Sequence, residues 1–398
     1  YSSQNATLVT AGIQAALDAH SGVYFPAGYY KINTTILMND NNFILGEGRA
    51  TILYALGFNG AVIAGKNAST TRRYNGGGRD FKIEGPATYG SGYTSSIGLD
   101  MRNCTMFKWY NVQITRLYYG VRQGDSYSSY YNEYYGVDIG SVYYGYYSTY
   151  LGNENLVSGG RVNDCSVGTF DQDNSHNKYN GLAVELFKFA HQINTPAALD
   201  NHFLSSRVEN RSFTLTGSNI TLGTGSKTVT ISASDNTNFG AWISACIDTS
   251  APVYVQYDYA NYMLGTFTSY NSGAATVTFN ATTLVGSGTY IASDCEMYFG
   301  YGFNIHADSQ DTVIFYPAFQ TTAINYTASG NYATGSRTHL YSTDSSEAGI
   351  RLSVGSFYIS GALSKGSGSF RIDHPLPEKS NTHDLVHSFI EGPQADLI

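Results

Sequence analysis

The chain has 398 residues, with 22 Lys and Arg against 30 Asp and Glu, which gives a net charge of −8. This acidic balance argues against nucleic acid as a partner, and no apolar run approaches the ~20 residues of a membrane-spanning helix, so we expect no membrane insertion. The 43 Gly, 35 Tyr and only 8 Pro disfavour helices and suit pleated sheets, so the composition predicts a mostly β protein.

The chain begins at Tyr1 without a Met or a leader pattern, which predicts that it was processed or is a fragment. The cysteines are too few for a disulfide scaffold, and no two have the spacing of a zinc knuckle: Cys104, Cys165, Cys246 and Cys295. We therefore expect neither structural zinc nor another cofactor.

One amphipathic helix is predicted near the N-terminus, where apolar residues recur at helical spacing over residues 8–17 with Thr10 as the cap. Short strands follow, separated by a turn at Pro26. The order of the helix, "VYFPAGYYKI" and "ILGEG" over residues 8–53 resembles the entry of the pectate-lyase-like parallel β-helix proteins, a family that includes many viral tailspikes. The resemblance implies a fold and leaves the chemistry open.

From Arg79 onward, strands such as DFKIEG, EYYGVDIG and GRVNDCSVGTF recur at irregular intervals of roughly 20–25 residues, as the coils of a solenoid do. Three residues beside strand starts are expected to stabilise turns: Asn103, Asn111 and Asn163. Cys104 and Cys165 are expected to be small buried residues, with a disulfide between them as the weaker alternative.

Between residues 212 and 299 the coil rhythm gives way to alternating strands, which predicts an antiparallel β module. This stretch resembles a small β domain that recurs in phage tail-fibre proteins, on Met263, Gly265, Thr266, Tyr270, Asn271 and Gly286–Tyr290. Where that family has an aromatic residue just after the closing motif, this chain has Cys295. A disulfide between Cys295 and Cys246, in the same module, is one expectation, and two free thiols are the equal alternative.

Coil-like sequence resumes at residue 300, and the stretch from Gly368 to Ile398 resembles the opening of a C-terminal region in tail and surface fibres of phages and large algal viruses. In that family the region continues past the point that corresponds to Ile398. The predicted domains are therefore a cap and β-helix (1–211), the β module (212–299), resumed β-helix (300–366) and the start of a fibre region (367–398). His383 and His387 have the spacing of two metal ligands on a helix, near His374, but a structural role is favoured and no metal is expected.

Tyrosine is concentrated between residues 127 and 150. Adjacent strand residues face opposite ways, so paired tyrosines must leave some rings exposed, and Tyr suits contacts with sugars and proteins. Four are expected to bind a glycan or receptor: Tyr130, Tyr134, Tyr143 and Tyr146. The alternative is that these rings pack along the solenoid or against neighbouring subunits.

For chemistry, a glycosidase needs two carboxyl groups about 5–5.5 Å or 6.5–9.5 Å apart. Asp171 and Asp173 would share one face at roughly 6.8 Å if their stretch is extended, which makes them the candidate catalytic pair. A polar turn is the competing interpretation of the same residues. Stacked coils offer further carboxylates: Glu133, Asp138, Asp164 and Glu185.

Together these observations predict an all-β fold, a right-handed parallel β-helix with an inserted small antiparallel β domain, in a homotrimeric fibre. The resemblances imply a tail-fibre or tailspike subunit on the virion surface, which binds a host-surface glycan or receptor and contacts other virion tail or capsid proteins. The alternative is a tailspike depolymerase, a glycoside hydrolase or lyase that uses clustered Asp and Glu. A cellular pectin-type lyase is disfavoured, because neither the insert nor the C-terminal stretch belongs to that class.

Overall fold

The computed structural model describes residues 9–65, 71–124, 128–174, 176–194, 201–204, 207–209, 211–258 and 261–300, and beyond these the backbone of seven strands. The chain divides into two units, Tyr1–Gly349 and Ile350–Ile398. Within the described ranges nearly all regular structure is strand, beside two α-helices, α1 (Thr10–Ala19) and α2 (Ala233–Cys246). No helix in this part of the chain is long and apolar enough to cross a membrane.

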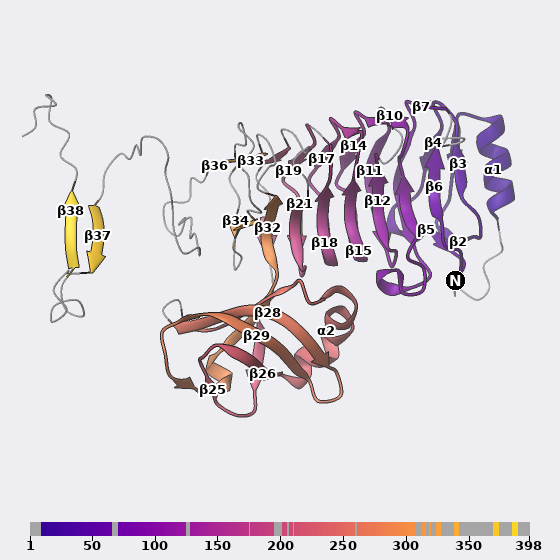
Figure 1. Cartoon of the computed structure of the whole chain (residues 1–398). Helices are drawn as coiled ribbons and strands as arrows, with labels where there is room; N and C mark the ends of the chain where they lie inside the picture. The colour runs from indigo at the N-terminus through magenta and orange to yellow at the C-terminus, as the bar shows by residue number, and fades with distance from the viewer. Residues whose placement is uncertain are drawn as a thin grey trace, which may run out of the picture. The chain divides into compact units, whose positions relative to one another are not determined.

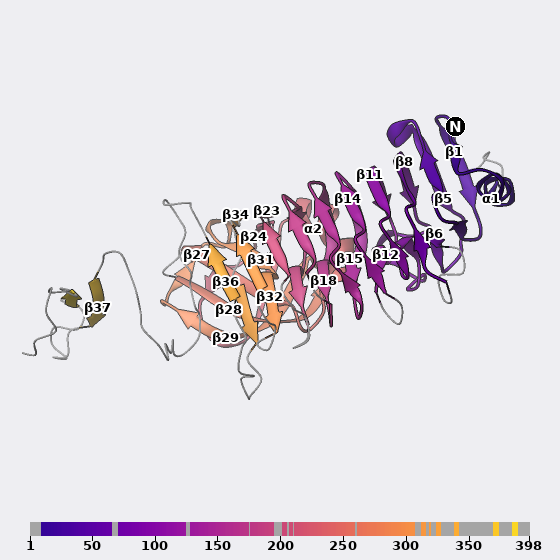
Figure 2. The same cartoon turned by 90° about the horizontal axis from the view of Figure 1, so that it is seen from above.

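The first unit is built on a parallel β-solenoid, here called the shaft, whose stacked coils are shown in Figures 1 and 2. Each coil contributes to three sheet faces. The first face contains β1 (Gly22–Tyr24), β4 (Phe43–Leu45), the starts of β8 (Gly77–Glu84) and β11 (Lys108–Thr115), β14 (Glu133–Tyr135), β17 (Leu156–Ser158), β19 (Lys178–Asn180), β22 (His202–Leu204), β33 (Thr312–Phe315) and β36 (Thr338–Tyr341).

The second face contains β2 (Gly28–Ile32), β5 (Thr51–Ala55), the ends of β8 and β11, the starts of β15 (Asp138–Ser148) and β18 (Arg161–Asp171), β20 (Ala183–Glu185), β23 (Arg207–Glu209) and β34 (Ala318–Phe319). The third face contains β3 (Ile36–Met38), β6 (Ala61–Gly65), β9 (Ile97–Asp100), β12 (Tyr119–Gln123), the ends of β15 and β18, β21 (Phe189–Ile193), β32 (Tyr301–His306) and β35 (Ile324–Thr327). A short parallel sheet follows the third face: β7 (Arg73–Tyr74), β10 (Cys104–Thr105), β13 (Ser129–Tyr130) and β16 (Gly152–Asn153).

Aliphatic columns fill the interior of the shaft. One column passes from Leu53 through the second-face strands to Val208, and each of its members lies in register with the next: Leu53, Ile83, Ile114, Ile139, Val162, Val184 and Val208. All seven are fully buried. A solenoid buries its core by such stacking of neighbouring coils.

The N-terminal end of this core is covered by α1, whose Ile13 and Leu17 pack into the core cluster. Thr10 is the first residue of the helix and not its cap, which is a correction to the sequence prediction. Its hydroxyl instead bonds the side chain of Asn33 at 3.0 Å and so ties the helix to the first coil.

A ladder of buried asparagines holds successive coils together at the turn before the first face. Each side-chain Oδ1 accepts the backbone N–H of the equivalent residue one coil earlier, at 2.9–3.0 Å, and the members are Asn132, Asn155, Asn177 and Asn201. Of the asparagines singled out by sequence, Asn103 occupies a turn with φ of 55°, whereas Asn111 lies within β11 with φ of 50°. Asn163 lies within β18.

The inserted module is a closed antiparallel barrel between β23 and β32: β24 (Phe213–Thr216), β26 (Gly225–Ile231), β29 (Thr276–Val285), β28 (Asn261–Asn271), β27 (Pro252–Asp258) and β31 (Glu296–Phe299). A short pair, β25 (Ile220–Thr221) and β30 (Thr289–Tyr290), accompanies it. The first and last barrel strands pair directly, with Phe213 opposite Met297. The predicted fold class, a parallel β-helix with an inserted antiparallel β domain, is confirmed. The four domain boundaries stay predictions.

Helix α2 belongs to the barrel and was not predicted from sequence. It begins at Ser232, whose hydroxyl accepts the N–H of Asp235 at 3.1 Å. Its Trp242 donates from Nε1 to the Cys165 carbonyl of the shaft at 2.9 Å, and Ser166 donates to the Cys246 carbonyl at 2.9 Å. These bonds join the barrel to the corner between the second and third faces.

All four cysteines are free, buried thiols. The predicted Cys246–Cys295 disulfide is therefore not formed, and neither is the alternative between Cys104 and Cys165. Cys165 belongs to the shaft core and Cys295 to the barrel core, where each acts as a small apolar residue.

The second unit contains one antiparallel hairpin, β37 (Ser369–Asp373) and β38 (Asp384–Ser388). His387 lies in β38, so it is on a strand and not on the helix that a paired histidine metal site would need. His374 and His383 lie outside the described residues.

Candidate functional site

Aromatic rings stack along the outward side of the third face and its preceding corner. We call this set the aromatic ladder: Tyr118, Tyr119, Tyr143, Tyr144, Tyr147 and Phe170. Three pairs from successive coils are nearly parallel, with centroids 4.8 Å apart for Tyr118–Tyr143, 5.3 Å for Tyr119–Tyr144 and 4.9 Å for Tyr147–Phe170. The spacing between neighbouring strands, about 4.7–4.9 Å, sets this stacking distance.

A glycine recurs at the same place in β9, β12, β15 and β18 and separates outward from inward residues there. An outward residue precedes a glycine that approaches the next coil closely, as in Tyr119-Gly120, Tyr144-Gly145 and Val167-Gly168. A Cβ on Gly145 would lie 2.4 Å from the Gly168 carbonyl oxygen and 2.6 Å from a Val162 methyl group. Glycine is therefore required at this close approach.

Two outward columns run along the third face. One joins Ala61, Ile97, Tyr119, Tyr144, Val167 and Phe189, and the other joins Leu37, Ala64, Asp100, Arg122, Tyr147, Phe170 and Gln192. The aromatic members lie together in the middle coils. Smaller and polar members lie toward the N-terminal coils, where the face is hollowed.

The hollow is a groove of about 530 Å³ over β3, β6 and β9. Its lining includes small apolar side chains and a charged group at one end, formed by Asp100, Arg102 and Arg122. Arg102 pairs with Asp100 at 2.5 Å. The Arg122 guanidinium lies 5.5 Å from the centroid of the Tyr119 ring and 5.9 Å from that of Tyr147, so it joins the groove to the aromatic ladder.

Burial raises the pKa of three ladder tyrosines, Tyr118, Tyr143 and Tyr144, so their hydroxyl groups stay protonated across the physiological range. Burial, followed by the neighbouring tyrosines, raises the pKa of Tyr118 to about 12 and that of Tyr144 further. Because the rings stack on one another, their faces are largely covered. The ladder lies beside Arg122, which is 5.5 Å and 5.9 Å from the Tyr119 and Tyr147 ring centroids.

The structure brings only one of the four predicted binding tyrosines into this ladder. Tyr143 stacks on Tyr118. Tyr134 and Tyr146 are fully buried in the shaft core, which contradicts a binding role for them. Tyr130 lies on β13 of the short sheet, where Arg72 is 5.2 Å from its ring centroid, and is not part of the ladder.

The predicted catalytic pair is wrong. Asp171 is fully buried inside the shaft, and its Oδ1 accepts bonds from Asn174 at 2.7 Å, Asn177 at 3.2 Å and Tyr179 at 3.0 Å. Burial raises the pKa of Asp171 to about 6. The strand ends at Asp171 and the chain turns, with φ of 51° at Asp173, so the two carboxylates do not share an exposed face. The polar-turn interpretation fits this geometry.

The other carboxylates offered by sequence each have a partner. On the first and second faces these are Glu133 with Lys108 at 3.1 Å, Asp138 with Arg49 at 2.5 Å, and Glu185 with Arg161 at 3.7 Å. At the corner, Asp164 accepts from the hydroxyl groups of Tyr89 and Ser141. These pairings fit structural ion pairs between coils better than a poised acid and base.

No family model matches the chain, and no curated protein matches it. Among solved structures, the catalytic domain of a GH87 α-1,3-glucanase is 17% identical at a TM-score of 0.38, over 52% of this chain and 38% of that chain. The ORF18 protein of Geobacillus virus E2 is 13% identical at a TM-score of 0.33, over 72% and 74%. The tailspike protein of Acinetobacter phage vB_ApiP_P1 is 8% identical at a TM-score of 0.28, over 74% and 84%. The fold assignment rests on the strand pairing of this chain itself.

Proposed function

We propose that the chain binds a polysaccharide along the third face of the shaft, and that it serves in this way as a tail-fibre or tailspike subunit attaching a virion to a host-surface glycan. The observation that carries the proposal is the continuity of the aromatic ladder with the groove through Arg122. A linear polymer can follow such a surface over several coils.

The chemistry of the surface suits sugars. The tyrosine hydroxyl groups can donate and accept hydrogen bonds, as sugar hydroxyl groups do. Arg122 and Asp100 add a fixed donor and acceptor where the groove begins. Many weak contacts of this kind support reversible attachment, and avidity in an oligomer strengthens it.

The test uses Tyr→Phe changes, which keep each ring stack and remove only the hydroxyl group. We expect the Tyr144→Phe, Tyr147→Phe double variant to bind at least tenfold more weakly to whichever polysaccharide the wild-type protein selects from an array of bacterial capsules, O-chains and algal wall polysaccharides. Tyr110→Phe is the matched control, because Tyr110 forms a stacked pair with Tyr135, centroids 5.0 Å apart, on the first face. Equal binding by the double variant and the control would contradict the proposal.

Polymer cleavage is measured on the same retained polysaccharide. New reducing ends or unsaturated products would favour the depolymerase alternative over attachment alone. Since Asp171 is buried, the Asp171→Asn, Asp173→Asn variant is expected to keep full binding.

Assembly as a homotrimer is part of the same proposal. Large apolar side chains are exposed along the short-sheet edge of the shaft, on successive coils: Tyr74, Met106, Tyr131 and Tyr150, at 40–57%. Such a row parallel to the coil axis can be covered by a second copy of the chain. Light scattering should give about three times the 43.2 kDa chain mass, and Met106→Asp should lower it. A wild-type monomer would overturn this part.

A further inference from the structure

The barrel contains its own pocket, separate from the shaft. It has a volume of about 340 Å³ and lies between β24, β26 and the short strand β25. That volume is at the lower end of the range for small-molecule sites, about 300–1,000 Å³. The pocket therefore has room for a single ring-sized ligand.

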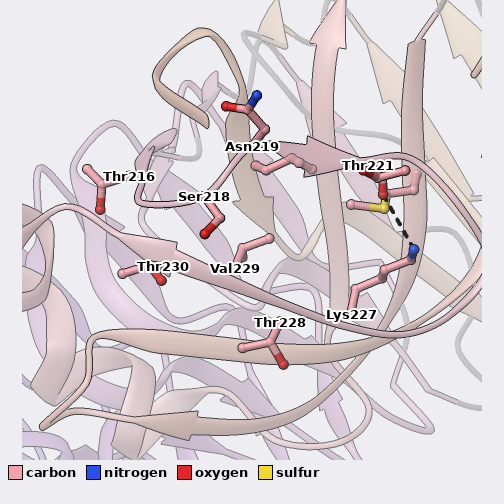
Figure 3. A pocket seen from close by; sticks show the side chains of 10 residues that line it. Thr216, Ser218, Asn219, Thr221, Lys227, Thr228, Val229 and Thr230 are labelled. Carbon is pink, nitrogen blue, oxygen red and sulfur yellow. Dashed lines mark hydrogen bonds between the residues drawn. The ribbon is translucent and has the colours of Figure 1, made fainter. Parts of the chain in front are cut away.

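Hydroxyl groups form most of its polar wall. They come from two barrel strands and from the β25 segment: Thr216, Ser218, Thr221, Thr228 and Thr230. Figure 3 shows Thr216, Ser218 and Thr230 on one side, and Lys227 reaching toward Thr221 on the other. Three of these hydroxyl groups already have partners, Thr216 with the Ile231 carbonyl, Thr221 with Thr289 and Thr228 with Thr278. Each keeps at least one acceptor position that a sugar hydroxyl group can use.

The floor of the pocket is apolar. Ile220, Val229 and Met263 line it and are only 7%, 5% and 1% exposed. Their side chains belong to the barrel core, which holds them in place. An apolar floor beneath a hydroxyl wall fits the two-sided character of a sugar, whose C–H groups need apolar contact.

One positive charge lies at the wall. Lys227 is the only charged residue among those that line the pocket, and its Nζ donates to the Thr221 carbonyl at the long distance of 3.4 Å. An ammonium group has three donors, so this bond leaves capacity for a ligand. Gly223 makes room for the ammonium, because a Cβ there would lie 2.9 Å from Nζ.

We propose that this pocket is a second saccharide site, which takes a terminal acidic sugar and pairs its carboxylate with Lys227. The single charged side chain that lines the pocket is the cation Lys227, and it favours an anionic ligand over a neutral one. The proposal is independent of binding along the shaft.

The test is a titration of the full chain, followed by NMR or calorimetry, with four probes: methyl glucuronide, N-acetylneuraminic acid, methyl glucoside and inorganic phosphate. We expect at least one acidic sugar to bind at least tenfold more tightly than methyl glucoside. Lys227→Met should abolish that difference. Lys31→Met, which removes the same charge from the shaft, should leave it unchanged.

Three outcomes would overturn the proposal: equal affinity for glucuronide and glucoside, affinity for phosphate alone, or acid-sugar binding that Lys227→Met does not alter. The Tyr144→Phe, Tyr147→Phe variant separates the two sites. Acid-sugar binding that this shaft variant abolishes would place the ligand on the shaft and also contradict the barrel site.

Discussion

Tyr144 and Tyr147 lie on the same strand with two residues between them, and both rings face outward with centroids 5.0 Å apart. Strict alternation would send them to opposite sides of the sheet. Between them, Gly145 lies against the next coil and Tyr146 is fully buried, so the strand directs two successive residues inward. The ladder exists because of this local irregularity.

Substitution of the glycine tests that explanation. Gly145→Ala should lower the free energy of unfolding by about 1–3 kcal/mol, because the added methyl group collides with the next coil. Gly12→Ala is the control: it lies in α1 with nothing near its Cβ position, and alanine there favours the helix. Urea unfolding measures both. A Gly145→Ala protein as stable as wild type would contradict the close-approach argument.

We expect the loss of a hydroxyl group to change the melting temperature in opposite directions at two buried tyrosines. The Tyr146 hydroxyl is buried without a hydrogen-bond partner in the described part of the chain, whereas that of Tyr134 donates to Gln123 at 3.0 Å. A buried unpaired polar group costs about 1–3 kcal/mol, and a typical bond contributes about 1 kcal/mol. Tyr146→Phe should therefore raise the melting temperature and Tyr134→Phe should lower it. Calorimetry measures both melting temperatures. A Tyr146→Phe protein that melts lower than wild type, beside a Tyr134→Phe protein that melts higher, would contradict this contrast.

Asp171 makes stability depend on pH. Its folded pKa of about 6 lies above the ordinary 3.8, so between these values the native state holds a proton that the unfolded chain releases. The carboxyl group therefore destabilises the fold as pH rises through this window, by about 3 kcal/mol once both states are ionised.

Asp171→Asn should remove this dependence. Relative to wild type, the variant should gain stability between pH 4 and pH 7.5, measured by urea unfolding. Asp173→Asn, two residues further on, is the control and should show no such gain. Parallel pH profiles for wild type and Asp171→Asn would rule out the buried titration.

The asparagine ladder should contribute strongly to stability. Asn155→Ala leaves the buried N–H of Asn132 without its acceptor and removes a bond to the Ser129 carbonyl. We expect a loss of about 2–3 kcal/mol. Asn163→Ala, at a half-buried position of β18, should change the unfolding free energy much less. Thermal unfolding of both variants measures the contrast.

Sequence alone predicted the coils, the insert and its antiparallel character, because strand alternation, turn residues and composition are local signals. It did not predict α2, whose Asn, Thr and Gly residues disfavour helix and whose stability comes from burying Trp242 against the shaft. The choice of Tyr146 as a binding residue does not fit its burial, because the strand directs both Gly145 and Tyr146 inward. Aligning the coils on their glycines would have shown which residues face outward.

The catalytic prediction failed for a related reason. Whether Asp171 and Asp173 share a face depends on where the strand ends, and that is decided by the buried bonds to Asn174 and Tyr179. The sequence spacing of Asp171 and Asp173 does not predict such contacts between coils.

The direct pairing of Phe213 with Met297 places the two ends of the barrel side by side. The insert therefore connects β23 to β32 at the same corner of the shaft where residues 186–188 connect β20 to β21 one coil earlier. An insert with adjacent ends can be gained, lost or exchanged by recombination while the aromatic ladder stays intact. If the shaft and the barrel each bind a ligand as proposed, one of the two sites can therefore change at a single junction while the other stays.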